Sequence, residues 1–404
     1  MISAAAVRDF QLTRAPPEFL DDPYPTYRAL REHAPVHRLP DGSYFLTRYD
    51  DLVEVYRDAR TWSSDKKIQF KPAFGDSPLY EHHTTSLVFN DPPLHTRVRR
   101  ILMGALNQKA IARMEGDVAR QVDRLLGEMA AKGSVNFIDE FAAQIPIEVI
   151  GNLLDIPHAE RGPLRGWSVA ILSGLEPKLT PQMFEAGNRA VTDFIAYLKV
   201  LIEARRRHPG DFESDVLTRL IRGEKDGERL SDKELYHQCI FLLNAGHETT
   251  TNLIGNGLWL LLNNPGELAR LRADPALVPS AIEEMLRYDG PIQLNNRRLT
   301  APLALSGKTL PADTLVTIGI GAANHDPAQF PDPEGFDVGR KPNRHLAFGQ
   351  GDHVCVGMNV ARMEGRIALG RLLARFPKIE LDGAPERDRR IRFRGFRKLP
   401  VRVG

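Results

Sequence analysis

Residues 345–357 read H-L-A-F-G-Q-G-D-H-V-C-V-G and set Cys355 among three glycines, directly before a helical pattern over 358–374. Glycine permits positive φ and lets the backbone approach a neighbouring group closely. A thiol just before a helix N-terminus is biased toward the thiolate by the helix dipole and the free N–H groups. Such a thiolate can act as a nucleophile or as a metal ligand. For Cys355 alone, a buried free cysteine in a glycine-rich turn explains the pattern equally well.

The chain as a whole has the composition of a large globular protein. Its 404 residues are 42% hydrophobic, which is enough for a large buried core. The 54 basic and 52 acidic side chains nearly cancel, so nothing suggests nucleic acid as a partner. Cys239 and Cys355 are the only cysteines, which suits a reducing cytoplasm. We find no signal segment and no run of roughly 20 apolar residues, so we expect a soluble protein without a membrane span.

Helical patterns dominate the chain, and strand patterns are short. Hydrophobic periodicity predicts helices over 94–132 (interrupted near 104–107), 138–154, 160–173 and 181–207. Ser231 and Glu234 form a predicted capping box, which starts a helix that ends near 263. Strand patterns predict a hairpin over 36–49, two or three strands over 297–320, and a solvated strand pair over the arginine-rich 389–403. We see no domain boundary, so residues 1–404 are interpreted as one domain.

Residues 244–252, N-A-G-H-E-T-T-T-N, interrupt the apolar stretch of the long helix. Glycine and β-branched threonine are weak helix formers, and an unpaired buried carboxylate is costly. A functional requirement is therefore predicted at this point of the helix. A zinc-protease motif, H-E-x-x-H, would start at His247, but position 251 is threonine, so the second zinc ligand is missing.

The segment F-x-x-G-x-H-x-C-x-G at 348–357 resembles the haem-binding loop of the cytochrome P450 family. Further motifs of that family occur in its order along the chain: D-P-P-L-H-T-R-V-R at 91–99, A-G-H-E-T-T at 245–250, E-M-L-R at 284–287 and A-N-H-D-P at 323–327. The resemblance implies a mainly α fold with small β-sheets (α+β), a triangular prism of helices around a buried haem b. It also implies a monooxygenase that inserts one oxygen atom of O2 by hydroxylation, epoxidation or O-dealkylation.

The resemblance also implies residue roles. Cys355 is the expected proximal thiolate ligand of the haem iron. Glu248 is expected to relay protons, and Thr249 to hydrogen-bond the bound oxygen or an ordered water, where a widened helix turn forms a groove. The other residues expected to hold the haem, with propionate binding assigned to both histidines and both arginines, are His95, Arg99, Ala245, Gly246, Arg297, Phe348, Gly349, His353 and Gly357. A structural triad is expected of Glu284, Arg287 and Arg340.

The substrate pocket is expected to include Asn244, Ile292, Gln293 and Leu294. The amides of Asn244 and Gln293 predict a substrate with a polar group near the oxidised carbon, or a bound water in that place. A bond from either amide to a backbone partner explains it equally well. The loop that carries Lys66, Lys67, His82 and His83 is interpreted as solvated rather than as an anion site.

The resemblance further implies a monomer that receives two electrons from a separate ferredoxin or flavodoxin. A basic proximal face would attract such an acidic carrier, and its candidate members are Arg97, Arg100, Arg344, Arg362 and Arg366. Two alternatives remain, a peroxide-driven member of the family and a haem or ligand-binding protein without turnover. Neither needs the Glu248–Thr249 pair, which is present.

Overall fold

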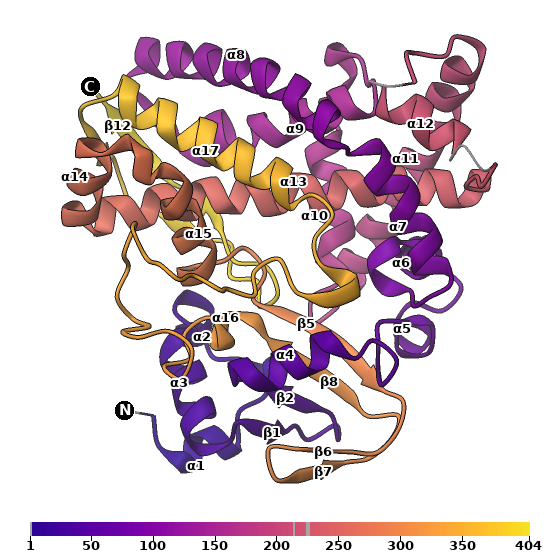
Figure 1. Ribbon diagram of the computed structural model, residues 1–404, viewed down its shortest axis with the longest axis vertical. Helices are drawn as coiled ribbons and strands as arrows, with labels where there is room; N and C mark the ends of the chain where they lie inside the picture. Colours follow the sequence, from indigo (N-terminus) through magenta and orange to yellow (C-terminus); the bar gives the residue numbers. More distant parts are fainter. Residues whose placement is uncertain (1, 213–214, 224–226) are drawn as a thin grey trace.

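One helix, α13 (Asp232–Asn263), crosses the molecule from side to side in this computed structural model, which describes residues 2–212, 215–223 and 227–404 (Figure 1). The predicted capping box is confirmed, since Ser231 Oγ accepts from the Glu234 N–H at 3.3 Å and Glu234 Oε2 accepts from the Ser231 N–H at 2.8 Å. Helices α9, α10, α11 and α17 pack around α13. Most of α13 is therefore buried on every side.

The predicted helices are largely confirmed. The 94–132 pattern forms α7 (Leu94–Ala105) and α8 (Gln108–Lys132), with the break where it was predicted. The 138–154 pattern splits into a π-helical turn (Ile138–Ala142) and α9 (Gln144–Leu153), and α11 (Pro181–Arg207) has its predicted bounds. α10 (Leu164–Ser173) begins later than predicted, after Pro163. The remaining helices are α1 (Ala4–Arg8), α2 (Pro17–Asp21), α3 (Tyr24–His33), α4 (Tyr49–Arg57), α5 (Lys67–Phe74), α6 (Pro78–Thr85), α12 (Val216–Arg222), α14 (Pro265–Ala273), α15 (Val278–Tyr288), α16 (Ile320–Ala323) and α17 (Met358–Arg375).

A five-stranded sheet lies at the opposite end of the molecule from α8 and α17 (Figure 1). Its strand order is β1 (Val36–Arg38), β2 (Tyr44–Leu46), β8 (Leu315–Gly319), β5 (Leu294–Leu299) and β3 (Trp62–Ser63). The predicted hairpin is β1–β2, and the 297–320 region holds four strands, since β6 (Leu303–Leu305) and β7 (Lys308–Leu310) pair separately. β5 lies between β8 and the edge strand β3, and its first residue, Leu294, is buried.

The C-terminal segment does not form the solvated strand pair that was predicted. β11 (Phe396–Lys398) pairs with β10 (Glu386–Arg387), and β12 (Pro400–Val403) lies between β4 (Ser134–Asn136) and β9 (Ile379–Leu381). Several of its arginines point inward because a buried carboxylate attracts them. Asp289, 3% exposed as a side chain, pairs with both Arg387 and Arg394.

The segment that carries Lys66, Lys67, His82 and His83 was predicted to be a solvated loop, and this is wrong except at Lys67, which is exposed. It folds into α5 and α6, and Lys66, His82 and His83 are buried. Lys66 Nζ donates to the Asn296 carbonyl at 3.0 Å, and the His83 ring packs against Phe70, Phe74 and Phe89. These side chains are therefore buried by packing and hydrogen bonding, although their polarity alone suggested that they would be exposed to solvent.

The predicted triad is assembled around the carboxylate of Glu284, which has no exposed side-chain surface. Arg287 Nε donates to Oε2 at 2.8 Å and Nη2 to Oε1 at 2.8 Å, while Arg340 Nε donates to Oε1 at 3.0 Å. Asn343 Nδ2 adds a bond to Oε2 at 3.0 Å. The same Arg287 reaches the carbonyl of Asn324 at 3.0 Å. α15 is thereby joined to the segments that precede the cysteine loop.

No helix among the described residues is both long enough and apolar enough to cross a membrane.

We expect Glu284→Gln to lower the free energy of unfolding by about 3–5 kcal/mol, because it leaves a buried guanidinium without its anion. A urea titration followed by circular dichroism measures the change. Glu386→Gln breaks the surface pair with Arg397 and serves as the control, with an expected loss below about 1 kcal/mol. Equal losses in the two variants would contradict a structural role for the triad.

Candidate active site

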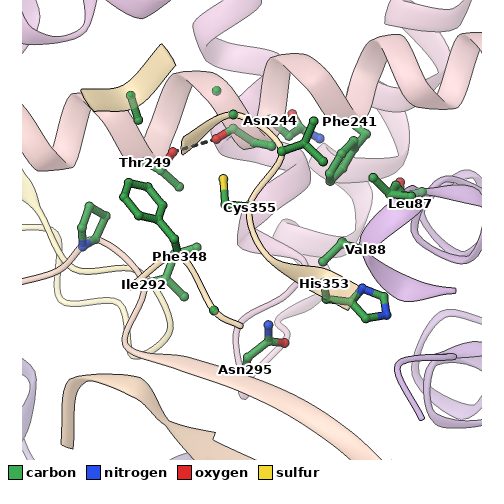
Figure 2. A pocket seen from close by; sticks show the side chains of 18 of the residues that line it. Leu87, Val88, Phe241, Asn244, Thr249, Ile292, Asn295, Phe348, His353 and Cys355 are labelled. Atoms are coloured by element: carbon green, nitrogen blue, oxygen red, sulfur yellow. Dashed lines mark hydrogen bonds between the residues drawn. The ribbon is translucent and has the colours of Figure 1, made fainter. Parts of the chain in front are cut away.

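A large cavity lies between α13, the cysteine loop and β5 (Figure 2). Most of the side chains that line it are apolar. The lining therefore suits a ligand with a large apolar surface.

The cysteine loop forms one wall of this cavity, and the Cys355 side chain is open to it (Figure 2). The Cys355 N–H donates to the Phe348 carbonyl at 2.9 Å, which closes the loop. Gly349 and Gly351 both have φ of +66°, and a Cβ at Gly351 would stand 2.2 Å from the Tyr56 carbonyl. Gly357 lines the cavity with no atom within 4 Å of a would-be Cβ. The glycine pattern therefore shapes the turn and leaves open space beside the sulfur.

Four side chains that are cationic or become so on protonation converge on the same cavity, namely His95, Arg99, Arg297 and His353. The rings of His95 and His353 lie 4.0 Å apart between centroids, and the Nε2 atom of each ring is buried without a partner. Burial, followed by the charges of Arg297, His95 and Arg99, lowers the pKa of His353 to about 2. A cluster of cationic and hydrogen-bond-donating side chains such as this one is suited to bind the carboxylates of a ligand.

The wall opposite the cysteine loop is α13. Within a mostly buried stretch of this helix, Ala245 is exposed, so the helix surface is open to the cavity at this turn. α13 remains α-helical through this turn, so the widened turn expected there is not present as a break in the helix. Thr249 lines the cavity and donates to the Ala245 carbonyl at 2.7 Å (Figure 2). A Cβ on Gly246 would lie 2.6 Å from Ile150 Cδ1, so this glycine is required by packing against α9 as well.

Glu248 points away from the cavity and is 5% exposed. Its Oε1 pairs with Arg390 and accepts from Asn252 Nδ2 at 3.2 Å. Burial acts to raise the pKa of Glu248, but Arg390 and His247 outweigh it, so the pKa lies below its ordinary value. The carboxylate is thus held ionised next to the turn that carries Thr249.

The remaining pocket candidates divide. Asn244, Ile292 and Leu294 line the cavity. Gln293 does not, because its Nε2 donates to the Gly290 carbonyl at 2.9 Å and its side chain packs over Gly321. Of the two explanations considered for the Gln293 amide, the structure has the hydrogen bond to a backbone carbonyl and not a side chain directed into the pocket. Asn244 Nδ2 instead lies 3.3 Å from His82 Nε2, and its Oδ1 is buried without a partner.

Several lining residues were not expected individually. Leu87, Val88 and Phe241 form an apolar part of the wall (Figure 2), and Arg392 and Phe393 reach the cavity from the C-terminal segment. Leu87 and Val88 precede the D-P-P-L-H-T-R-V-R motif at 91–99, and Phe241 lies on the same helix as Asn244. Nothing in the alternating R-R-I-R-F-R pattern indicates which arginines turn inward, since that depends on carboxylates far away in the sequence.

A helical fold in which one cysteine and a hydroxyl-bearing helix face each other across a cation-rimmed cavity is the arrangement expected of a thiolate-ligated haem protein. The chain belongs to the cytochrome P450 family, whose profile, described as Cytochrome P450, matches residues 171–399. It is 38% identical over 406 residues to Cytochrome P450 107B1 of Saccharopolyspora erythraea, which covers 96% of each chain. It is 37% identical over 398 residues to the 6-deoxyerythronolide B hydroxylase of that organism, covering 95% of this chain and 96% of the relative.

Among solved structures, P450BioI in complex with an acyl carrier protein ligated to hexadec-9Z-enoic acid superposes with a TM-score of 0.91 at 32% identity. The superposition covers 96% of this chain and 100% of that chain. The fold is therefore that of the P450 family. Relatives are named as hydroxylases and monooxygenases, so the chain is an oxidoreductase of the P450 monooxygenase type.

The residues of the cavity fit a haem. Cys355 would supply the sulfur ligand, and the unpartnered ring nitrogens of His95 and His353, with Arg297, would suit the propionates. Burial raises the pKa of the Cys355 thiol, and the Gly357 N–H and the charges of Arg99 and Arg362 only partly oppose this. Burial thus opposes the thiolate bias predicted from the helix N-terminus, and an iron bound to Cys355 would favour the deprotonated sulfur.

We expect Arg297→Leu to weaken haem retention about tenfold, because hydrogen bonds to a charged group contribute about 1.5–3 kcal/mol each. Haem per chain, measured as the pyridine haemochrome after dialysis, gives the change. The neighbouring Arg298 pairs with Asp313 instead of lining the cavity, so Arg298→Leu is the matched control. Haem content equal in the two variants would show that Arg297 does not hold the cofactor.

Proposed function

We propose that this chain is a haem-thiolate monooxygenase that inserts one oxygen atom of O2 into a small organic substrate, with haem b as its cofactor and Cys355 as the iron ligand. Bound there, the haem would supply oxygen activation. The observation that carries the proposal is the placement of Cys355 and Thr249 on facing walls of one cavity, with Glu248 beside Thr249 on α13. Hydroxylases among the relatives favour hydroxylation over epoxidation or O-dealkylation.

The protein's part in the chemistry is proton supply. Thr249 Oγ1 donates to the Ala245 carbonyl, so its lone pairs remain available to accept a proton donor inside the cavity. Glu248 is an acceptor in its ionised state and is turned toward Arg390. To deliver protons to the cavity, its carboxylate must exchange that partner for water, so Arg390 sets how readily the relay opens.

The substrate pocket is apolar with a polar patch on α13. The Asn244 amide contacts His82, and both residues line the cavity. The buried, unpartnered Oδ1 of Asn244 supports a substrate that donates a hydrogen bond, or a water in that position. Gln293 is dropped from this part of the proposal because it does not line the cavity and its Nε2 donates to the Gly290 carbonyl and to the Tyr24 hydroxyl.

Electrons would come from a ferredoxin or flavodoxin that docks on the proximal face. Four of the arginines assigned to that face already have carboxylate partners: Arg97 with Glu234, Arg100 with Glu228, Arg362 with Glu283 and Arg366 with Glu115. Arg344 is exposed, and no described carboxylate pairs with it. The proposal of a basic docking patch therefore rests mainly on Arg344.

The spectrum of the reduced, carbonyl-bound protein tests the thiolate assignment, since a strongly red-shifted Soret band is expected.

Thr249→Ala should still bind substrate and accept electrons, yet release most of them as hydrogen peroxide, because the proton path into the cavity is impaired. The measurement is product and peroxide formed per electron consumed. Thr251→Ala is the control, because Thr251 Oγ1 is buried and donates to the His247 carbonyl. Unchanged coupling in Thr249→Ala would favour the peroxide-driven alternative.

Arg344→Glu should slow reduction by a bacterial ferredoxin several-fold at low ionic strength, because a steering charge is reversed. The difference should vanish near 0.5 M salt, where the Debye length falls to about 4 Å. Stopped-flow reduction at several salt concentrations measures this effect. Arg38→Glu on the edge strand β1 makes the same change of charge and is expected to have no effect. A rate for Arg344→Glu that equals wild type at every salt concentration would remove Arg344 from the docking site.

A further inference from the structure

The segment from β10 to β11 carries six arginines, and five of them pair with carboxylates. Arg387 and Arg394 pair with Asp289, Arg389 with Asp21, Arg390 with Glu248 and Arg397 with Glu386. Arg392 is different, since no carboxylate in the described part of the chain lies within ion-pair distance of its guanidinium. It is also the arginine of this group that lines the cavity.

The partners of the Arg392 guanidinium are neutral. Its Nε donates to the Leu175 carbonyl at 3.0 Å and its Nη2 to Asn296 Oδ1 at 2.5 Å. The nearest acid, Glu176, uses Oε2 to accept the backbone N–H groups of Ile391 and Arg392. Burial raises the pKa of Glu176, and the charges of Arg390 and Arg392 oppose this rise. Burial also lowers the pKa of Arg392, although a guanidinium stays protonated in proteins.

The position of Arg392 is fixed by its backbone. Its carbonyl accepts from the Gln293 N–H at 2.9 Å, and the Arg394 N–H donates to the Pro291 carbonyl at 2.8 Å. Between them, Phe393 bridges to Ile292. The third nitrogen, Nη1, donates to no described residue and is not enclosed by protein. A rigid segment therefore holds a charged donor at the cavity wall with part of its hydrogen-bonding capacity unused.

We infer that Arg392 binds a carboxylate of the substrate. This inference rests on the proposed monooxygenase function and deepens it, because it gives the chemical class of the substrate as an apolar carboxylic acid. A guanidinium recognises a carboxylate through charge-assisted, often bidentate, hydrogen bonds. Keeping such a cation buried without an anion is costly, and an acidic ligand would remove that cost while the apolar lining takes its body. His83, which is neutral because burial lowers its pKa to about 3, brings no competing charge.

A haem propionate is a second source of the same chemistry. Asn296, which holds Arg392, is adjacent in sequence to Arg297, a residue assigned to the propionates. Two observations favour the substrate. The other bond of the guanidinium is to Leu175, which with Leu172 belongs to the apolar lining. In addition, four other side chains already face the propionate region, whereas no other described cation in the cavity lacks such an assignment.

The test uses the haem-loaded protein with two probes that differ only in charge, dodecanoic acid and dodecanamide. Their dissociation constants are measured at neutral pH by equilibrium dialysis and by the ligand-induced shift of the Soret band. We expect the wild type to bind the acid at least about tenfold more tightly than the amide, and Arg392→Gln to bind both within about twofold. Arg392→Lys should keep part of the preference, and Arg389→Gln, on an exposed pair, should keep all of it.

Two results would overturn the inference. One is a wild type that does not prefer the acid, and the other is Arg392→Gln with the preference intact. If Arg392→Gln instead loses haem while its preference for the acid is unchanged, the arginine serves a propionate. The carbonyl spectrum of the same samples tests the proposed function separately, because dialysis reports acid binding whether or not that spectrum shows a thiolate ligand.

Discussion

The buried carboxylate of Glu284 is the point on which the proximal half of the molecule depends. Through Arg287 it reaches the Asn324 carbonyl, and the Asn324 side chain in turn accepts the Leu346 N–H at 2.8 Å. Leu346 begins the turn that closes on Cys355 through successive backbone bonds. The sulfur is therefore positioned by a chain of hydrogen bonds that starts at a charge with no access to water, where each bond is strong and costly to lose.

A second constraint is the amount of positive charge that the fold keeps inside. Arg297, Arg390, Arg392 and Arg394 are all buried or half-buried, and each lies where an acidic group is either present or expected. The charge of the interior therefore depends on what occupies the cavity, because carboxylates of a bound ligand would compensate the buried guanidinium groups. Cofactor and substrate are in this sense part of the core of the protein.

The sequence allowed local features of the structure to be predicted, but not the contacts between residues that lie far apart along the chain. The bounds of α11 and α13, the capping box at Ser231 and the motif residues around the cavity followed from periodicity and from resemblance. Gln293 and the arginines after 386 could not be placed, because their orientation is decided by Gly290, Asp289 and Glu248, which lie elsewhere in the fold. For the same reason the segment that carries Lys66, His82 and His83 was taken for a solvated loop, although packing against Phe70 and Phe74 buries His83.

The inward turn of the C-terminal segment also bears on how the protein is made. Arg392 and Phe393 are the last residues along the chain to line the cavity, and the chain reaches them well after Cys355 and α13. During synthesis the cavity therefore lacks one wall until these residues leave the ribosome. This part of the cavity wall is therefore the last to be completed as the chain is synthesised.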